Sequence, residues 1–457
     1  MSPSIASVVC GCVILGLFWL DRNQRVRTSG ALWIPVIWFS IACSRAVSAW
    51  LQMGEPVQSA DQVLEGSPID RLFYSGLMAV GIVVLVGRRR LVGRFLRANG
   101  PILLFFFYCL VSLVWSDYPD VGFKRWTKGV GDLVMALIIL SDREPLGAVE
   151  RLFARTAYVL LPLSVLFIKY YPNLGRDWGY WGGETSYQGV TLNKNTLGMI
   201  CLLFGMGALW RFLRAYQAQE DTGRTRRMIA QAIILAMVLW LLLMANSMTS
   251  LPCFLMGSAL LLTTNLRVVI RRPAAVHVLV AAMLVVSASV VFLGASPSAL
   301  KFMGRNPTLT DRTQLWGTLL SLVQNPWVGT GFESFWLGPR LETLWKLYWW
   351  HPNEAHNGYL EVFLNLGWVG VALLLVFLTI TYRKLFIAWR NNTLIGSLGL
   401  AYFLAGIVFN FTEAAFFRMQ APVWIFFVLL AVCAPTISSA RAIASSQDLE
   451  SASYRER

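Results

Sequence analysis

The sequence has little charge for its length. Only 14% of its 457 residues are Asp, Glu, Lys or Arg, whereas a soluble domain carries about 25%. Hydrophobic residues make up 56%, and the mean hydropathy of +0.57 is typical of a membrane protein. The net charge of +15 comes from short basic blocks between apolar runs, such as 88–90 and 224–227. Blocks of this kind mark the cytoplasmic loops of membrane proteins. Because the basic residues are not clustered on one soluble face, nucleic acid is excluded as a partner.

The sequence also lacks residue clusters that bind metals or form disulfides. Its seven cysteines lie in apolar runs without a C-x-x-C pair, which excludes a disulfide framework and a zinc site. Only three histidines are present, and no Asp-x-Asp motif occurs. The first apolar run follows residues 1–6 without a preceding positive charge, and no cleavage pattern follows it. We expect no metal, no cofactor and an uncleaved first span.

Apolar runs recur along the whole chain and predict an all-α polytopic membrane protein with about 12–13 transmembrane helices. The count depends on span two, which Ser40, Ser44 and Arg45 interrupt, and on the brief turn at 246–249. The expected spans are 4–20, 31–50, 72–87, 101–115, 129–141, 156–170, 196–212, 229–245, 249–266, 274–294, 359–381, 394–411 and 420–437.

The distribution of Lys and Arg predicts which loops face the cytoplasm. With the N-terminus outside, 25 of the 39 basic residues fall in the inner segments, and the other 14 are balanced by 14 acids in the outer segments and the spans entering them. The expected inner segments are 21–30, 88–100, 142–155, 211–228, 265–273, 382–393 and the tail after 437.

The unequal loops divide the chain into four parts. We expect an N-terminal transmembrane bundle over 1–294, a large outer loop over 295–358, C-terminal spans over 359–437 and a disordered cytoplasmic tail over 438–457. Within the large loop, apolar residues at 315, 316, 319, 320 and 323 have helical spacing. This spacing predicts short amphipathic helices in the loop.

The segments 311–335 and 356–370 carry the most informative motifs. An arginine and a tryptophan on the expected helix lead into N-P-x-x-G-x-G-x-x-x-F, and a His-Asn pair, nine residues and G-x-x-G follow. The pattern resembles the O-antigen ligase and polymerase superfamily of bacterial envelope proteins. The matching positions are Arg312, Trp316, Asn325, Pro326, Gly329, Gly331, Phe335, His356, Asn357, Gly367 and Gly370.

Two further segments, 189–198 and 115–119, also resemble the family, whereas Ser247-Met248-Thr249 departs from its Ser-Arg-Thr pattern. The resemblance implies a glycosyltransferase that moves a glycan from an undecaprenyl-diphosphate carrier to an acceptor hydroxyl, on the outer side of the bacterial inner membrane. Such a transfer needs cations over the diphosphate and a base at the acceptor. Cationic side chains can replace a metal here, so the resemblance implies metal-independent transfer.

Arg312 is the first candidate for the diphosphate, because a guanidinium binds phosphate oxygens with two parallel hydrogen bonds. Outside this motif, the same arginine would be read as a contact to lipid headgroups. Lys194, between two asparagines at the outer end of a span, serves equally well as an interfacial anchor. Arg125 and Arg176 are weaker candidates, which lie in the other two polar outer loops.

His356 is the candidate base, because an imidazole can accept a proton at neutral pH. The alternative is a hydrogen-bonded structural histidine, which is the reading we prefer for His351. Asn357, Glu361 and Asn365 recur every four residues and form one polar stripe at a membrane entrance. A carboxylate there is costly unless it is paired, so Glu361 is expected to orient the histidine or to pair with a cation such as Arg312.

The remaining motif residues divide between substrate contact and structure. Tyr359 lies near the polar stripe, and Trp316 belongs to the arginine helix; we expect both, with Asn357, to contact substrate. Gly329 and Gly331 are expected to form a tight turn, and Gly367 and Gly370 to allow close helix packing.

The sequence therefore predicts polymerisation of lipid-linked repeat units in exopolysaccharide or O-antigen synthesis. The first alternative is a ligase that passes the glycan to lipid A core or to a protein, and the second is a polysaccharide or anion transporter. The expected partners are the lipid-linked oligosaccharide, an acceptor glycan and the bilayer, with a chain-length regulator and a flippase beside them. Sugar, linkage, acceptor and oligomeric state are left open.

Overall fold

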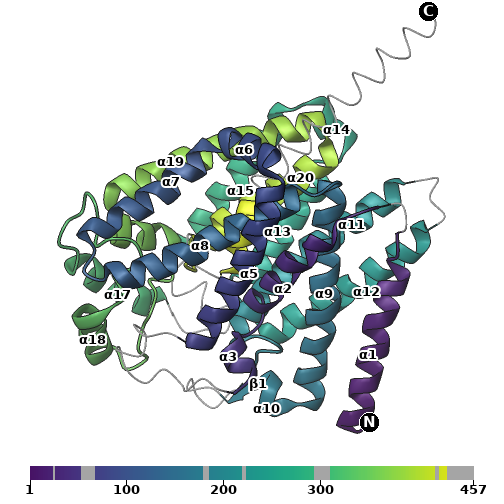
Figure 1. Ribbon diagram of the computed structural model, residues 1–457, viewed down its shortest axis with the longest axis horizontal. Coiled ribbons are helices and arrows are strands. Elements are labelled where there is room, and N and C mark those ends of the chain that lie inside the picture. Colours follow the sequence, from purple (N-terminus) through teal and green to yellow (C-terminus); the bar gives the residue numbers. More distant parts are fainter. Residues whose placement is uncertain are drawn as a thin grey trace, which may run out of the picture.

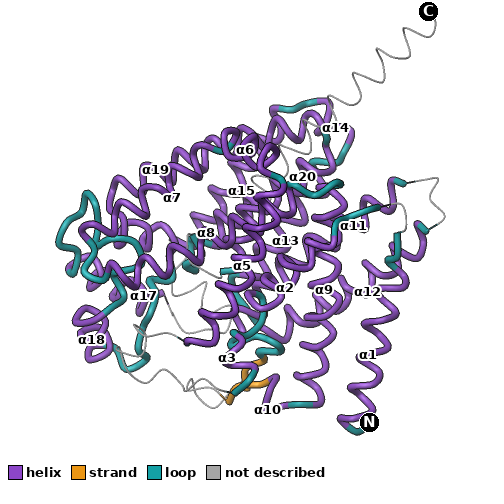
Figure 2. Tube along the Cα trace, viewed as in Figure 1, coloured by secondary structure: helices purple, strands orange, loops and turns teal. Residues whose placement is uncertain are grey.

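The computed structural model shows an almost entirely helical chain (Figures 1 and 2). It describes residues 1–23, 26–52, 67–178, 185–218, 223–292, 309–416 and 421–429. The two strands, β1 (Arg176–Trp178) and β2 (Thr185–Tyr187), pair antiparallel beside α10. This confirms the predicted all-α class. The expected tail, 438–457, and the first part of the large loop, 295–308, lie outside the described residues.

The helices of the N-terminal half are α1 (Pro3–Leu20), η1 (Gly30–Leu32), α2 (Trp33–Ala42), α3 (Val47–Trp50), α5 (Pro68–Gly87), α6 (Arg89–Ala98), α7 (Gly100–Val111), η2 (Ser112–Trp115), α8 (Pro119–Leu140), α9 (Pro145–Tyr170) and α10 (Pro172–Gly175). Those that follow are α11 (Lys194–Gln217), α12 (Arg224–Ala245), α13 (Ser250–Thr263), α14 (Arg267–Arg271), α15 (Ala274–Phe292), α17 (Leu309–Ser321), α18 (Gly338–Leu347), α19 (Gly358–Asn391) and α20 (Thr393–Phe409). Residues 422–429 are also helical.

Helices α9 and α11 form the centre of the bundle. Two thirds of the most apolar window of each is buried, whereas α1 and α15 expose most of theirs. Helix α11 packs against α12 and α13, and α20 packs against α13 and α19. Helix α1 lies at one edge of the bundle, against α9 (Figure 1). The exposed apolar surface of α1 and α15 is the surface expected to face lipid.

Seven of the described helices are long and apolar enough to cross a membrane, or eight if the bent pair α6 and α7 forms one span. The expected spans 31–50, 249–266 and 394–411 coincide with shorter apolar helices. Span two is not one helix, because α2 ends at Ala42 and α3 begins at Val47. The predicted break near 246 is confirmed, since Asn246 ends α12 in the left-handed conformation. Within the described residues, length and composition therefore support seven or eight of the 12–13 expected spans, and the expected span 420–437 lies partly outside these residues.

The connecting segments gather on two faces of the molecule. Segments predicted as cytoplasmic form one face, called here the basic face, and are joined by the pairs Ser29–Asp142, Arg211–Asp21, Arg214–Glu150 and Lys384–Asn99. Segments predicted as outer form the other, called the loop face, and are joined by the pairs Ser7–Tyr171, Arg45–Thr191, Arg125–Glu333 and Arg340–Asp117. These contacts join loops of the same predicted side, and which set faces the cytoplasm stays a prediction.

The large loop has a hydrophobic core of its own. Helices α17 and α18 lie together at one end of the molecule, away from α1 (Figure 1). Leu315 and Leu319 of α17 are buried against Phe335, Leu344 of α18 and Leu364 of α19. The helix expected from the spacing of 315, 316, 319, 320 and 323 is present but ends at Ser321, before 323, and its buried face covers the loop's core. The division of the chain into four parts stays a prediction.

The two faces generate a test of sidedness. We expect single cysteines at Asp120 and Glu342, on the loop face, to react with an impermeant maleimide in intact cells. Cysteines at Gly93 and Asn391, on the basic face, should react only after lysis, since basic loops stay in the cytoplasm. All four positions avoid buried side chains, and the background lacks the seven native cysteines. Labelling of position 342 only after lysis would invert the orientation.

Candidate functional site

The two glycine motifs meet in one structural feature, a break in α19 at Gly367. Gly367 has φ +62° and ψ −165°, which is not helical, so the helix loses hydrogen bonds on both sides. The turn at 326–331 replaces them. Its N–H groups at Thr330 and Gly331 donate to the carbonyls of Leu364 and Asn365, 3.2 and 2.9 Å away. In return, the carbonyls of Pro326 and Trp327 accept from the N–H groups of residues 368 and 369.

Glycine is required at this junction for two reasons. Gly329, Gly331 and Gly367 have positive φ angles, which side chains other than glycine rarely adopt. A Cβ on Gly329 would lie 2.5 Å from the backbone of Asn365, and one on Gly367 would lie 2.3 Å from the backbone of Trp327. The turn at 326–331 is therefore in direct backbone contact with α19 at residues 364–369.

His356 lies between two carboxylates just before α19. Its Nδ1 is 3.0 Å from Oε1 of Glu354 and 3.4 Å from Oε2 of Glu413, which follows α20. Because ionised carboxylates only accept hydrogen bonds, they place a proton on Nδ1 and leave Nε2 as the basic nitrogen. Among the described residues, Nε2 has no partner, and the side chain is 24% exposed. This arrangement suits a general base whose imidazole is oriented by carboxylates at Nδ1 while Nε2 accepts the proton.

Four separate segments converge on this histidine. Asn195 in the first turn of α11 donates to Oε1 of Glu413 at 3.4 Å, and Lys194 beside it is exposed. Arg312 of α17 donates to the backbone carbonyl of Thr412 at 2.9 Å. We call Lys194, Arg312, Glu354, His356 and Glu413 the histidine cluster. Of its two cations, Arg312 contacts residue 412, and Lys194 is next in sequence to Asn195, which contacts Glu413.

Glu361 has different partners from those expected. Its buried carboxylate accepts from the indole of Trp336 at 2.9 and 3.0 Å and from the N–H of Ala355 at 2.7 Å. Trp316 donates to the carbonyl of the same Ala355 at 2.7 Å. Ala355 is therefore held at both its N–H and its carbonyl. Glu361 and Trp316 act on His356 through the preceding residue, and they help to hold His356 in its left-handed conformation of φ +49°.

Two other predicted substrate contacts have structural partners. Asn357 caps α19, because its Oδ1 accepts from the N–H groups of Tyr359 and Leu360 at 3.0 Å each. The Tyr359 hydroxyl donates to the carbonyl of Ile407 on α20 at 3.1 Å. These contacts explain both side chains without a substrate, and their role in binding stays a prediction.

Arg125 and Arg176 also have partners in the structure. Arg125 forms an ion pair with Glu333 at 3.1 Å. Arg176 donates to the carbonyl of Ile168 and lies over the ring of Tyr187. Neither contact links these arginines to the histidine cluster, so the geometry favours Arg312 and Lys194 as the cations beside His356.

Glu354 and Glu413 were not among the site residues predicted from the sequence. Glu413 ends the polar segment 410–413 after an apolar run, a position where a carboxylate is uncommon in a membrane protein. Its partner His356 lies 57 residues earlier, which no local pattern reveals. The donor atoms of Glu354, His356 and Glu413 lie within 4.8 Å of one another, close enough to hold a metal ion.

These helices and loops define the class of the chain, a multi-pass membrane protein with a polar site beside its membrane-spanning helices. Residues 232–375 match the O-antigen ligase family, and this stretch contains Arg312, His356 and the broken helix. The chain is also 26% identical over 322 residues to the exopolysaccharide production protein ExoQ of Rhizobium meliloti (strain 1021), covering 68% of this chain and 70% of that protein. Both matches agree with the resemblance of the sequence motifs to the O-antigen ligase and polymerase superfamily.

The broken helix gives a stability prediction. We expect Gly367→Ala to lower the unfolding free energy by roughly 1–3 kcal/mol or more, because the new Cβ meets backbone at a positive φ. Gly317→Ala on α17 is the matched control, since a Cβ there meets nothing within 4 Å. Thermal unfolding of the purified proteins in detergent measures both. Equal melting temperatures for Gly367→Ala and the wild type would contradict the backbone contact described here.

Proposed function

We propose that this protein transfers glycans from undecaprenyl-diphosphate carriers and thereby polymerises repeat units of an exopolysaccharide or O-antigen. Similarity to the O-antigen ligase family and to an exopolysaccharide production protein supports glycan transfer in the cell envelope. The observation that carries the chemical step is His356, whose Nδ1 faces two carboxylates while Nε2 stays available. The proposed site lies on the periplasmic side of the bacterial inner membrane, because it is on the loop face, opposite the basic loops.

In the proposed step, Nε2 of His356 accepts the proton of the acceptor hydroxyl. The hydroxyl oxygen attacks the anomeric carbon, and the bond from that carbon to the diphosphate oxygen breaks with its electron pair. Glu354 and Glu413 stabilise the imidazolium that forms, as a carboxylate behind a catalytic histidine does. A single displacement of this kind inverts the configuration at the anomeric carbon.

The leaving diphosphate requires positive charge beside the acceptor. Arg312 and Lys194 are the proposed sources, because Arg312 contacts the carbonyl of Thr412 and Lys194 is next in sequence to Asn195, which contacts Glu413. Lys194 also lies at the first turn of α11, where the helix dipole adds partial positive charge. Cations fixed in place before the reaction stabilise the charge that develops on the departing oxygen.

The acceptor distinguishes polymerase from ligase. Similarity to ExoQ, an exopolysaccharide production protein, favours polymerisation, whereas the match to the O-antigen ligase family favours ligation. We propose a polymerase, with a second lipid-linked repeat unit as acceptor and a flippase and chain-length regulator as neighbouring partners. Purified protein given one lipid-linked repeat unit alone should form a ladder of polymers. A ligase would form no ladder until a different acceptor is added.

The proposed base generates a mutational prediction. We expect His356→Ala to bind carrier lipid but to turn over about 10²–10⁴-fold more slowly, since that is the usual contribution of a general base. Initial rates with purified lipid-linked substrate measure the loss. Glu354→Gln and Glu413→Gln should each slow turnover less, because His356 keeps one carboxylate.

His351→Ala is the matched control for His356→Ala. His351 also has a positive φ, of +47°, but it stacks on Trp345 and has no carboxylate partner among the described contacts. We expect it to keep most of its activity. If His356→Ala retained half of the wild-type rate at normal protein level, the base would lie elsewhere.

Metal independence is proposed for the same reaction. We expect turnover to survive EDTA, because Arg312 and Lys194 supply the positive charge that a metal would otherwise provide. Initial rates before and after chelation test this. Loss of activity that Mg²⁺ or Mn²⁺ restores would instead assign Glu354, His356 and Glu413 as metal ligands, and Glu354→Gln would then alter the metal requirement.

A further inference from the structure

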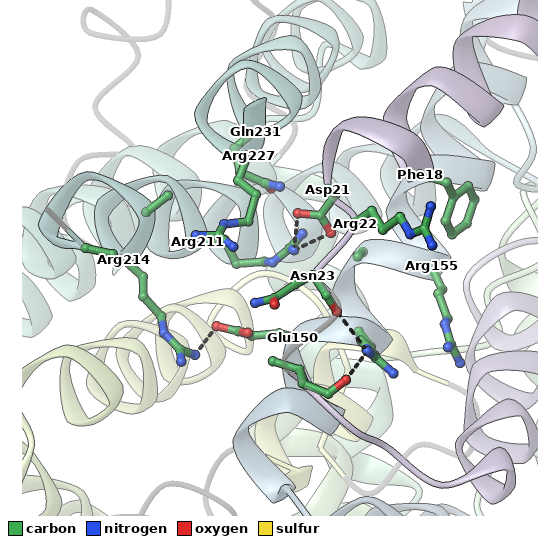
Figure 3. Close-up of a pocket in the computed structure, with 15 residues that line it drawn as sticks. Phe18, Asp21, Arg22, Asn23, Glu150, Arg155, Arg211, Arg214, Arg227 and Gln231 are labelled. Carbon is green, nitrogen blue, oxygen red and sulfur yellow. Dashed lines mark hydrogen bonds and ion pairs between the residues drawn. The ribbon is translucent and has the colours of Figure 1, made fainter. Parts of the chain in front are cut away.

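A cavity of about 280 Å³ opens on the basic face, at the other end of the bundle from the histidine cluster. It lies between the C-terminal ends of α1 and α11 and the N-terminal parts of α9 and α12 (Figure 3). Six arginines and two carboxylates line it, an excess of four positive charges. The lining arginines are Arg22, Arg151, Arg155, Arg211, Arg214 and Arg227.

Some of these arginines hold the cavity wall together. Arg211 donates to both oxygens of Asp21 at 2.6 and 2.7 Å and to the Tyr158 hydroxyl at 3.0 Å. Arg214 pairs with Glu150. Both carboxylates of the cavity are thereby engaged by arginines, as the dashed contacts in Figure 3 show. Arg151 donates to the Thr28 hydroxyl and to the carbonyl of Asn23, and neither Arg22 nor Arg155 forms an ion pair with an acid of the lining among the described contacts.

Among the lining residues, Arg155 gives the clearest indication of a bound ligand. Its guanidinium lies 4.2 Å from the ring centroid of Trp33, and its Nη1 is buried without a hydrogen-bond partner among the described residues. Arg151 is one helical turn away on the same face of α9. A guanidinium that has one buried, unpaired N–H group and lies beside a second arginine is unfavourable unless an anion is present.

We infer that this cavity binds a phosphate group. A tetrahedral phosphate offers several acceptor oxygens and negative charge, which match the guanidinium donors of Arg155 and of the exposed Arg22. The volume accommodates a phosphate or diphosphate group with its first attached atoms, and it lies near the lower end of the range for ligand pockets. The apolar lining by Phe18, Val26 and Ala154 suits the attached part of a lipid headgroup.

This site is separate from the proposed transferase site. Arg211 and Lys194 are 17 residues apart on the continuous helix α11, which corresponds to about 25 Å along its axis. The phosphate bound in the cavity is therefore a different molecule, or a different part of one, from the diphosphate proposed beside Arg312. The phosphate group belongs either to an anionic phospholipid, which could enter from the bilayer beside the lipid-facing helix α1, or to a phosphate compound from the aqueous side.

Ligand-induced stabilisation of the purified full chain tests the proposal. The melting temperature in a zwitterionic detergent is measured with inorganic pyrophosphate, with phosphatidylglycerol and with phosphatidylcholine. We expect pyrophosphate or phosphatidylglycerol to raise it by a few degrees and phosphatidylcholine to have a smaller effect. A shift with pyrophosphate identifies the phosphate group as sufficient, and a shift with phosphatidylglycerol alone identifies a lipid headgroup. No shift in either arm overturns the inference.

Variants assign the effect to the cavity. Arg155→Gln combined with Arg22→Gln should weaken binding about tenfold or more, since each removes a charged hydrogen-bond donor. Arg226→Gln is the matched control, because Arg226 is on the same face but stacks on Trp19 outside the cavity. Ala218→Phe adds bulk to the lining, keeps every charge and should also reduce binding. Equal losses in Arg226→Gln, or unchanged binding in Ala218→Phe and the double variant, would overturn the inference.

Discussion

The exchange of backbone hydrogen bonds between the turn at 326–331 and the break in α19 is the constraint on which the loop face depends. A helix broken near a membrane exposes carbonyl and N–H groups, and each costs several kcal/mol in a nonpolar medium unless it is paired. Here the turn pairs them on both sides of Gly367. The loop cannot shift along α19 without losing these bonds, so its position relative to the membrane helices is fixed.

The backbone position of His356 depends on this attachment through a series of hydrogen bonds. The turn leads into Ser334 and Phe335, whose N–H groups donate to Asn365 on α19, and then to Trp336, which donates to Glu361. Glu361 in turn accepts from the residue before His356. The loop's own hydrophobic core supports the same arrangement from the other side. A polar chain of contacts thus extends from the broken helix to the imidazole.

The sequence predicted the helical class and a helix in the large loop that contains 315, 316, 319 and 320, because these depend on local periodicity. It did not predict the break at Gly367, since the apolar run 359–381 continues through it without interruption. The partner of the break lies about forty residues earlier in the chain. Glu413 was missed for the same reason. Glu361 was selected because an unpaired carboxylate is costly there; it reaches His356 through Ala355, and its described partners do not include the expected Arg312.

The division of charge between the two faces decides which residues matter for the proposed reaction. The basic face carries the excess that makes the chain +15, whereas basic and acidic residues balance in the outer segments. The loop face therefore offers no general positive field to an anionic leaving group. In the proposed reaction, Arg312, which contacts the carbonyl of Thr412, and Lys194, in the first turn of α11, supply the positive charge. Electrostatic stabilisation at such a site depends on placement more than on net charge.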